Sequence, residues 1–189
     1  NFNLFKLLVI LLLLVSCNGK HLSFSQLTQD IPAKPAVYLY KSDQLNYHMY
    51  IPKDLEMADA DYTDATGSEL FLNSNPKEIF KPGKYMISIL KLQSSEKTEE
   101  KAWKKYTQNL KKIEDFRIYS EGLTKFLSRK SYYVHYAFTV SKKNNEAISF
   151  MLKGHSNTYY AIILSSFTAE GQQDQMKKLL YCAKTLALD

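Results

Sequence analysis

Cysteine, glycine and long apolar runs are all scarce in this chain. Its 189 residues include two cysteines, Cys17 and Cys182, which excludes a zinc ribbon and a CxxC redox pair. The six glycines are isolated from one another, so no glycine-rich loop for binding phosphates or dinucleotides is present. HExxH and GxSxG patterns are also missing. These absences remove the enzyme classes that a sequence reveals most directly.

Charge is only mildly unbalanced. Lysine and arginine number 25 against 19 for aspartate and glutamate, a net charge of +6, and the basic residues are scattered along the chain. Nucleic-acid-binding proteins usually concentrate their basic residues in a patch, so we expect no nucleic-acid partner. A modest excess is compatible with a nearby layer of anionic lipid headgroups.

The longest uninterrupted apolar run, Leu7–Val15, has nine residues, whereas a membrane-spanning helix needs about 20. Lys6 precedes this run and a small residue follows it, which is the layout of a secretory signal. The end of the run, Leu14-Val15-Ser16-Cys17, resembles the lipobox of bacterial lipoproteins. The resemblance implies cleavage between Ser16 and Cys17 and a diacylglyceryl group on the Cys17 sulfur. A plain secretory signal that is cut near the same place is the alternative.

The lipoprotein interpretation divides the chain into three parts. Residues 1–16 form the signal peptide, residues 17–36 hold the lipidated cysteine and a flexible polar tether, and residues 37–189 form one domain. Asn18 is not the aspartate that retains lipoproteins in the inner membrane of enteric bacteria. We therefore expect a protein of the bacterial cell envelope, anchored in the outer membrane if the organism sorts by that rule.

With Cys17 acylated, Cys182 has no partner for an intrachain disulfide. It lies at helical spacing from Leu179 and Leu186. We expect a buried thiol that behaves as a small hydrophobe, with a reactive thiol as the alternative.

Periodicity predicts one α+β domain. Apolar alternation indicates strands at residues 45–51, 70–72, 85–92, 132–140, 147–153 and 158–167, with a further hairpin from 116–119 and 124–127. Helices are expected at 99–113, after a Thr98 cap, and at 171–188. The short links between 132 and 167 force antiparallel neighbours. Strands, a helix, a meander and a closing helix indicate an α+β fold on an antiparallel sheet.

The order of the elements and some short sequence segments are similar to those of the PsbP-like family, which includes the envelope protein DcrB. The segments that carry the resemblance are the strand Tyr47–Lys53, the Glu- and Lys-rich helix Glu99–Ile113, the aromatic strand Tyr132–Tyr136 and the pair Tyr159-Tyr160. The resemblance covers residues 37–188 and implies an α/β/α sandwich on a curved antiparallel sheet. It also implies binding of proteins or assemblies, and it supplies no catalytic residues. Ser128-Arg129-Lys130 departs from the family, where a glycine-containing turn is usual.

Histidines and acids supply few site candidates. His48 and His135 fall on the more polar faces of predicted strands and could meet across a sheet. Together with His155, they are the residues that a hydrolase site assembled from distant parts of the sequence would use. Hydrogen-bonded sheet histidines are the ordinary alternative. An acidic stretch could form a calcium-binding loop, and a solvated loop without a metal is the alternative. Its acidic residues are Asp59, Asp61, Asp64 and Glu69. The EF-hand spacing fails, because glycine and glutamate are required where Asp64 and Leu70 stand. We predict no catalytic residue, metal or cofactor.

Two surface features stay open. If helices cover both faces of the sheet, which we favour, the strand tyrosines belong to the hydrophobic core. If helices cover one face only, these tyrosines form a recognition surface. They are Tyr132, Tyr133, Tyr136, Tyr159 and Tyr160. The lysines of the first helix indicate a solvated face, with anionic lipid or an acidic partner as the alternative; they are Lys101, Lys104, Lys105, Lys111 and Lys112.

The function expected from these observations is that of a lipid-anchored envelope protein, a non-catalytic binding or assembly module. Its partners would be the membrane, through Cys17, and a protein of unknown identity. A carrier of a small apolar ligand is one alternative, and a hydrolase with a site built from scattered residues is another.

Overall fold

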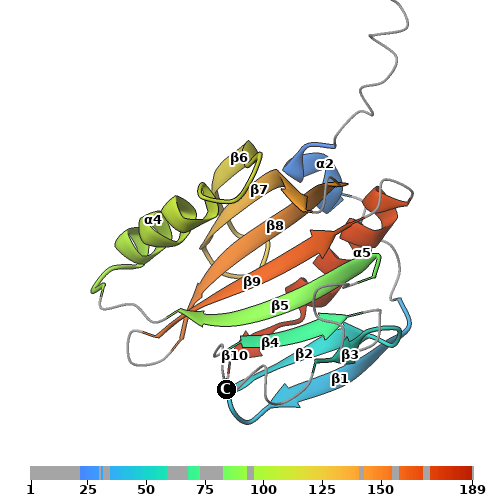
Figure 1. Cartoon of the computed structure of the whole chain (residues 1–189). Helices are drawn as coiled ribbons and strands as arrows, with labels where there is room; N and C mark the ends of the chain where they lie inside the picture. Colours follow the sequence, from blue (N-terminus) through green and yellow to red (C-terminus); the bar gives the residue numbers. More distant parts are fainter. Residues whose placement is uncertain are drawn as a thin grey trace, which may run out of the picture.

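The computed structural model describes residues 22–29, 31, 35–58, 68–72, 83–92, 96–140, 143–154, 158–167 and 171–188. The helices of this part are α2 (Phe24–Gln29), α4 (Glu99–Leu110) and α5 (Gln172–Lys184). The strands are β1 (Val37–Ser42), β2 (Tyr47–Pro52), β3 (Glu56–Met57), β4 (Ser68–Leu72), β5 (Tyr85–Leu92), β6 (Arg117–Thr124), β7 (Ser131–Val140), β8 (Lys143–Lys153), β9 (Tyr159–Ser166) and β10 (Ala187–Leu188). Figure 1 shows their arrangement.

Two antiparallel sheets organise the fold. The larger has seven strands in the order β3-β4-β5-β9-β8-β7-β6, and the smaller has three in the order β1-β2-β10. The strands β7, β8 and β9 are successive antiparallel neighbours in the large sheet, as the short links predicted. The chain returns through α5 to β10, which pairs with β2, so the C-terminal element closes the small sheet.

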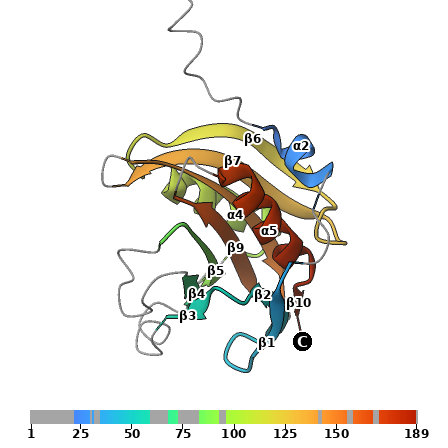
Figure 2. The same cartoon turned by 90° about the vertical axis from the view of Figure 1, so that its right-hand side faces the viewer.

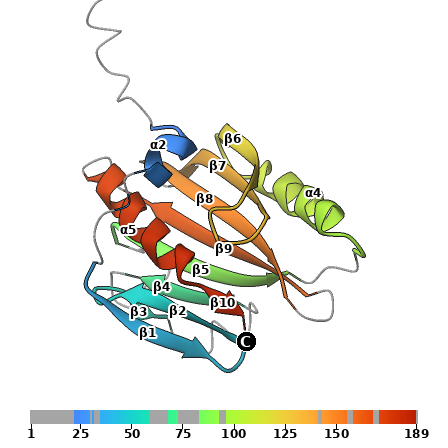
Figure 3. The ribbon, with the colours of Figure 1, turned by 180° about the vertical axis from the view of Figure 1, so that it is seen from behind.

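Helices lie on both faces of the large sheet, because its central strands are apolar on both sides. In β8, Ile148 and Phe150 face a cluster that includes Leu179 and Leu180 of α5, whereas Met151 faces a cluster that includes Trp103 of α4. Figure 3 shows α5 across one face, with the small sheet beside it. The fold is therefore the α+β fold on an antiparallel sheet that the periodicity predicted, in the α/β/α sandwich form that the resemblance to the PsbP-like family implied.

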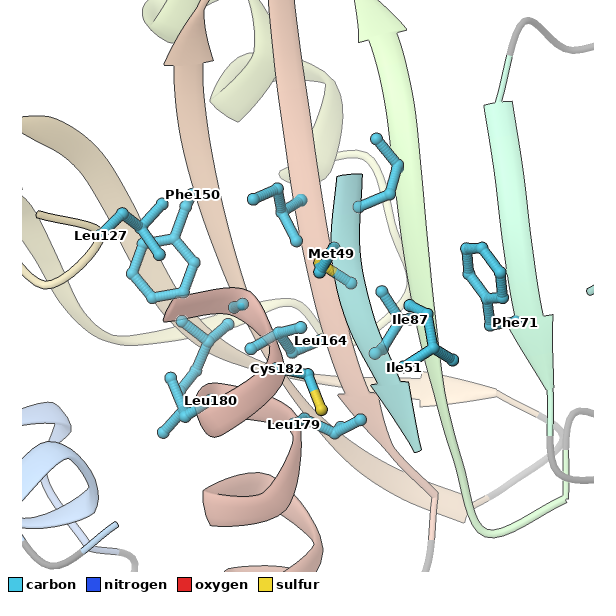
Figure 4. Packing of buried hydrophobic residues seen from close by; sticks show 14 of the residues in the cluster. Met49, Ile51, Phe71, Ile87, Leu127, Phe150, Leu164, Leu179, Leu180 and Cys182 are labelled. Carbon is cyan, nitrogen blue, oxygen red and sulfur yellow. The ribbon is translucent and has the colours of Figure 1, made fainter. Parts of the chain in front are cut away.

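The larger core cluster joins the two sheets. Met49 and Ile51 of β2 are fully buried and belong to the same cluster as Ile87 of β5 and Leu164 of β9. Figure 4 shows these side chains converging with those of α5. Fully burying one such side chain contributes about 1.5–3 kcal/mol, so the small sheet is held mainly by apolar contact.

Several predicted elements are confirmed at their expected positions. The strand predicted at 85–92 is β5 with those bounds, and the predicted Thr98 cap accepts a hydrogen bond from the backbone N–H of Lys101 at the start of α4. Ser128, in the turn before β7, adopts a left-handed φ of 63°, the conformation for which glycine is usual. The turn therefore forms despite the departure from the family pattern, and β7 pairs with β6 from Ser131 onward.

Three local predictions are wrong. The closing helix expected over 171–188 ends at Lys184, and Ala187–Leu188 form the strand β10. The hairpin expected from 116–119 and 124–127 is a single strand, β6, that pairs with β7 and contains a bulge between Ile118 and Ser120. The flexible tether expected over 17–36 contains α2, whose Phe24 and Leu27 are buried against the core. Packing onto the domain, rather than helix propensity, orders these six residues.

None of the described helices is both long and apolar enough to cross a membrane.

Candidate functional site

The polar side chains that could carry chemistry gather in three clusters, two on the face of the large sheet that α5 covers and one between the sheets. We define them as the tyrosine–lysine cluster (Asp54, Tyr85, Lys178), the histidine cluster (Tyr119, His135, Glu146) and the glutamate cluster (Ser42, Tyr47, Glu69).

The tyrosine–lysine cluster joins three elements that are distant in sequence. Lys178 of α5 donates to the Oδ1 of Asp54 at 2.7 Å and to the Tyr85 hydroxyl of β5 at 2.8 Å. Tyr85 in turn donates to the Oδ2 of Asp54. The Lys178 ammonium also lies 5.1 Å from the centre of the Tyr85 ring, within cation–π range.

A lysine beside a tyrosine hydroxyl can form an acid–base pair, but the electrostatics here oppose it. Burial, together with the hydrogen bond to the Asp54 carboxylate and its charge, raises the pKa of Tyr85 well above its usual value. Burial acts to raise the pKa of Asp54, yet the hydrogen bonds from Lys178 and Tyr85 outweigh it and lower that pKa. A phenol held neutral by a carboxylate acceptor is a poor general base. The cluster therefore clamps α5 to β5.

The histidine cluster joins two buried side chains, His135 and Glu146, to the partly buried Tyr119. His135 of β7 is fully buried, and its Nε2 lies 2.5 Å from the Oε1 of Glu146 on β8. The bulge in β6 turns the Tyr119 ring edge-on to the imidazole, with ring centres 5.0 Å apart. Burial and the nearby Glu146 charge raise the pKa of Tyr119. The His135 Nδ1 has no hydrogen-bond partner within the described residues.

The structure keeps the candidate histidines apart. His48 lies on β2 in the small sheet, whereas His135 lies on β7 in the large sheet, so they do not meet across a sheet as the sequence suggested. His155 lies outside the described residues. Among the residues that are described, no group of three or more His, Cys, Asp or Glu side chains could hold a metal ion.

The glutamate cluster corrects the calcium interpretation as far as Glu69 is concerned. Glu69 lies in β4, is 3% exposed, and accepts hydrogen bonds from Ser42 at 2.6 Å and from Tyr47 at 2.5 Å. Its carboxylate thus links the large sheet to β1 and β2 of the small one. Asp59, Asp61 and Asp64 lie outside the described residues.

The strand tyrosines belong to the interior, as predicted. Tyr136, Tyr159 and Tyr160 are at most 7% exposed. The hydroxyl of Tyr136 lies 3.2 Å from that of Ser149, which also accepts a hydrogen bond from Tyr106 of α4 at 2.9 Å. Tyr132 and Tyr133 are half-buried and pack on opposite faces of the sheet, against the α4 and α5 clusters respectively.

Cys182 also lies where the sequence placed it. The side chain is fully buried in the α5 core, and burial raises the thiol pKa to about 12. The prediction of a small buried hydrophobe is confirmed for this residue.

Sequence reasoning missed most partners in these clusters. Glu146 could have been found, because pairing 132–140 with the next strand places it diagonal to His135, two residues from the directly opposite Ile148. Asp54, Tyr85 and Lys178 left no local signal, since 93 residues separate Tyr85 from Lys178. All three clusters connect elements inside the fold. The outward surface carries exposed lysines, including Lys101, Lys104 and Lys105 of α4 and Lys111 and Lys112 just after it.

Comparisons with known proteins show a fold rather than a family. No family model and no curated protein matches the chain. Among solved structures, CyanoP, a PsbP protein of the cyanobacterium Synechocystis, aligns with 92% of this chain and 97% of its own at 14% identity and a TM-score of 0.53. The Ran-binding protein Mog1p of Saccharomyces cerevisiae aligns with 80% of this chain and 95% of its own at 10% identity and a TM-score of 0.53.

A third similar structure is that of a mycobacterial protein. LpqN, involved in cell envelope biogenesis of Mycobacterium tuberculosis, aligns with 90% of this chain and 99% of its own at 7% identity and a TM-score of 0.52. The chain spans about half the length, 49%, of a Bacteroides thetaiotaomicron protein that it also resembles in structure. The chain thus has the fold shared by PsbP-like and Mog1 proteins.

Proposed function

We propose that this protein is a lipid-anchored component of the bacterial cell envelope, where it acts as a non-catalytic module that binds or assembles other proteins. The observation that carries the proposal is the sequence Leu14-Val15-Ser16-Cys17 in front of a domain whose described polar clusters are bonded internally. Acylation at Cys17 supplies the location, and the closed clusters leave binding as the role for the surface.

The neighbours of known structure support both halves of the proposal. LpqN is involved in cell envelope biogenesis, and Mog1p binds the protein Ran. The outer membrane is the proposed destination, because Asn18 follows the cysteine.

The anchor is tested by growing cells with a labelled fatty acid. The full-length protein should incorporate the label, and the Cys17→Ala variant should not. Blocking the lipoprotein signal peptidase should make the precursor accumulate. Cys182→Ala is the matched control, since it removes the other cysteine and should leave labelling unchanged. A labelled Cys17→Ala variant contradicts the anchor.

The binding role is tested by crosslinking in native membranes. The same partner should be attached to the wild-type protein in repeated preparations, and the Cys17→Ala variant, released from the membrane, should lose most of it. Recovery of the uncrosslinked protein alone, in repeated experiments with crosslinkers of different reach, contradicts a stable assembly.

A further inference from the structure

Five exposed basic side chains gather at one end of the large sheet, and together they define the basic end: Lys125, Arg129, Lys130, Lys153 and Lys184. Lys125, Arg129 and Lys130 belong to the turn between β6 and β7. Arg129 donates to the backbone carbonyl of Lys153, the last residue of β8, at 3.3 Å. The turn and the end of β8 therefore form one surface.

The basic end adjoins α2, the first described helix. Phe126, in the turn after β6, makes an edge contact with Phe24 of α2, with ring centres 6.1 Å apart. The ammonium of Lys184, the last residue of α5, lies 5.7 Å from the centre of the Phe126 ring. Figure 2 shows α2 beside β6 and β7. The sequence of α2, FSQLTQ, contributes no acidic side chain that would offset these charges.

This is also the end from which a lipid at Cys17 would hold the domain. Leu22 packs against the core, and it is five residues after Cys17. Because an extended chain spans at most about 3.5 Å per residue, Leu22 lies within about 18 Å of the acylated cysteine. Such a short link keeps α2 and its neighbours next to the membrane surface.

From this placement, which rests on the proposed acylation of Cys17, we propose that the basic end is a second membrane contact that docks onto anionic phospholipid headgroups. The acyl anchor on Cys17 limits the distance of the domain from the bilayer, and the basic end sets the orientation of the domain. Each Lys or Arg near an anionic surface strengthens attraction by about fivefold in the docking equilibrium constant. Leu123, at the end of β6, is 49% exposed and adds apolar area at the same edge.

The Glu99 carboxylate, which lies near the basic end, does not cancel its positive charge. Glu99 at the start of α4 feels the charges of Lys153, Arg129 and Lys130. Burial raises the pKa of Glu99, and these three charges oppose the rise. The partly buried Glu99 carboxylate is thus outnumbered by the five exposed cations of the basic end.

The lysines at the far end of the molecule provide a matched control. Lys111 and Lys112 follow α4, about 18 Å along the helix from its first residue. Lys143 begins β8, about 34 Å along the strand from Lys153. Both distances exceed the Debye length of about 8 Å at physiological salt, so these charges should not contribute to docking.

The experiment uses the full-length protein expressed in cells and purified as the processed form from membranes. It is reconstituted in nanodiscs of phosphatidylcholine alone or of equal parts phosphatidylcholine and phosphatidylglycerol. Amide hydrogen exchange is measured for wild type, for the patch variant Arg129→Gln/Lys130→Gln/Lys153→Gln, and for the control variant Lys111→Gln/Lys112→Gln/Lys143→Gln. Removing three charges should weaken docking by about 100-fold.

The expected result is slower exchange of the amides in the β6–β7 turn in anionic nanodiscs than in zwitterionic ones, for wild type and control variant but not for the patch variant. High salt should abolish the difference in exchange between the two lipid compositions for the wild-type protein. This result tests the electrostatic contact without any substitution. Equal exchange of the turn in both lipids overturns the proposal, as does protection that the patch variant keeps.

Failure of the anchor can be told apart from failure of the surface. If the processed protein carries no acyl chains, it is sedimented with vesicles of the same two compositions. Sedimentation that is specific to anionic vesicles and lost in the patch variant then supports the basic end and rejects the anchor. Absence of sedimentation rejects both.

Discussion

At the scale of single residues, buried polar groups hold the elements together. Glu69 is 3% exposed, and its two carboxylate oxygens accept from Ser42 and Tyr47. A hydrogen bond to a buried charged group contributes about 1.5–3 kcal/mol, and a buried donor left without its acceptor costs a similar amount. Glu69 is thus a specific polar link between two sheets that also share a large apolar core.

Replacing Glu69 should therefore be costly. Glu69→Ala removes the acceptor of two buried hydroxyls and should lower the free energy of unfolding by about 3 kcal/mol, measured by urea denaturation. Glu121→Ala, at an exposed position on β6, is the matched control and should change it by less than about 0.5 kcal/mol. Combining Glu69→Ala with Tyr47→Phe should give less than the sum of the two losses. Strict additivity contradicts a direct link.

Cys182 couples stability to pH at the alkaline end. Burial, aided by the Asp54 charge and opposed by Lys178, raises the thiol pKa from 9.0 to about 12. Between these values the unfolded chain has lost the thiol proton and the folded protein keeps it. Stability is therefore greatest below the unfolded pKa and falls as pH rises, by up to about 1.4 kcal/mol per pH unit.

The prediction is a difference in slope between two proteins. Urea unfolding at several pH values above about 9 should show a steeper loss of stability for wild type than for Cys182→Ala, by one proton. The two slopes should coincide near neutral pH, where the thiol is protonated in both states. Parallel slopes at alkaline pH contradict a buried, protonated thiol.

At the scale of elements, the sequence predicts those whose apolar period is unbroken. The strands β5 and β7 alternate over at least eight residues, β8 and β9 contain the mainly apolar runs Ala147–Leu152 and Tyr159–Leu164, and α4 has a cap and one apolar face. These patterns are local, so a single segment carries enough signal.

The elements that escaped prediction depend on distant contacts. The strand β6 contains Gly122 and a bulge at Tyr119, which breaks the alternation that marks a strand. The helix α2 has six residues, too few to be stable alone, and it forms because Phe24 stacks on Tyr133 at 4.0 Å between ring centres. The polar clusters escaped prediction for the same reason. The diagonal pair His135 and Glu146 is the exception, because the pairing of neighbouring strands could have shown it.

If α2 is part of the folded body, truncating its buried side chains should destabilise the domain. Phe24→Ala and Leu27→Ala should each lower the free energy of unfolding by about 2–4 kcal/mol, measured by chemical denaturation. Gln29→Ala, exposed in the same helix, should change it by less than about 0.5 kcal/mol. Equal stability of all three variants and wild type contradicts a structural role and restores a simple tether.

At the scale of the whole molecule, α2 changes what the lipoprotein signal implies. A tether as long as residues 17–36 would allow the domain to turn freely above the membrane. Since Leu22, five residues after Cys17, packs against the core, the proposed anchor leaves little freedom and presents one end of the sheet to the bilayer. The α4 face, with its exposed lysines, and the edges of the sheets then remain available to protein partners.

The most direct test of the anchored-module account is the intact mass of the N-terminal peptide of the full-length protein isolated from native membranes. The account predicts a peptide that begins at Cys17 and carries a diacylglyceryl group on the sulfur. A peptide that begins elsewhere, or one that contains an unmodified Cys17, would contradict it.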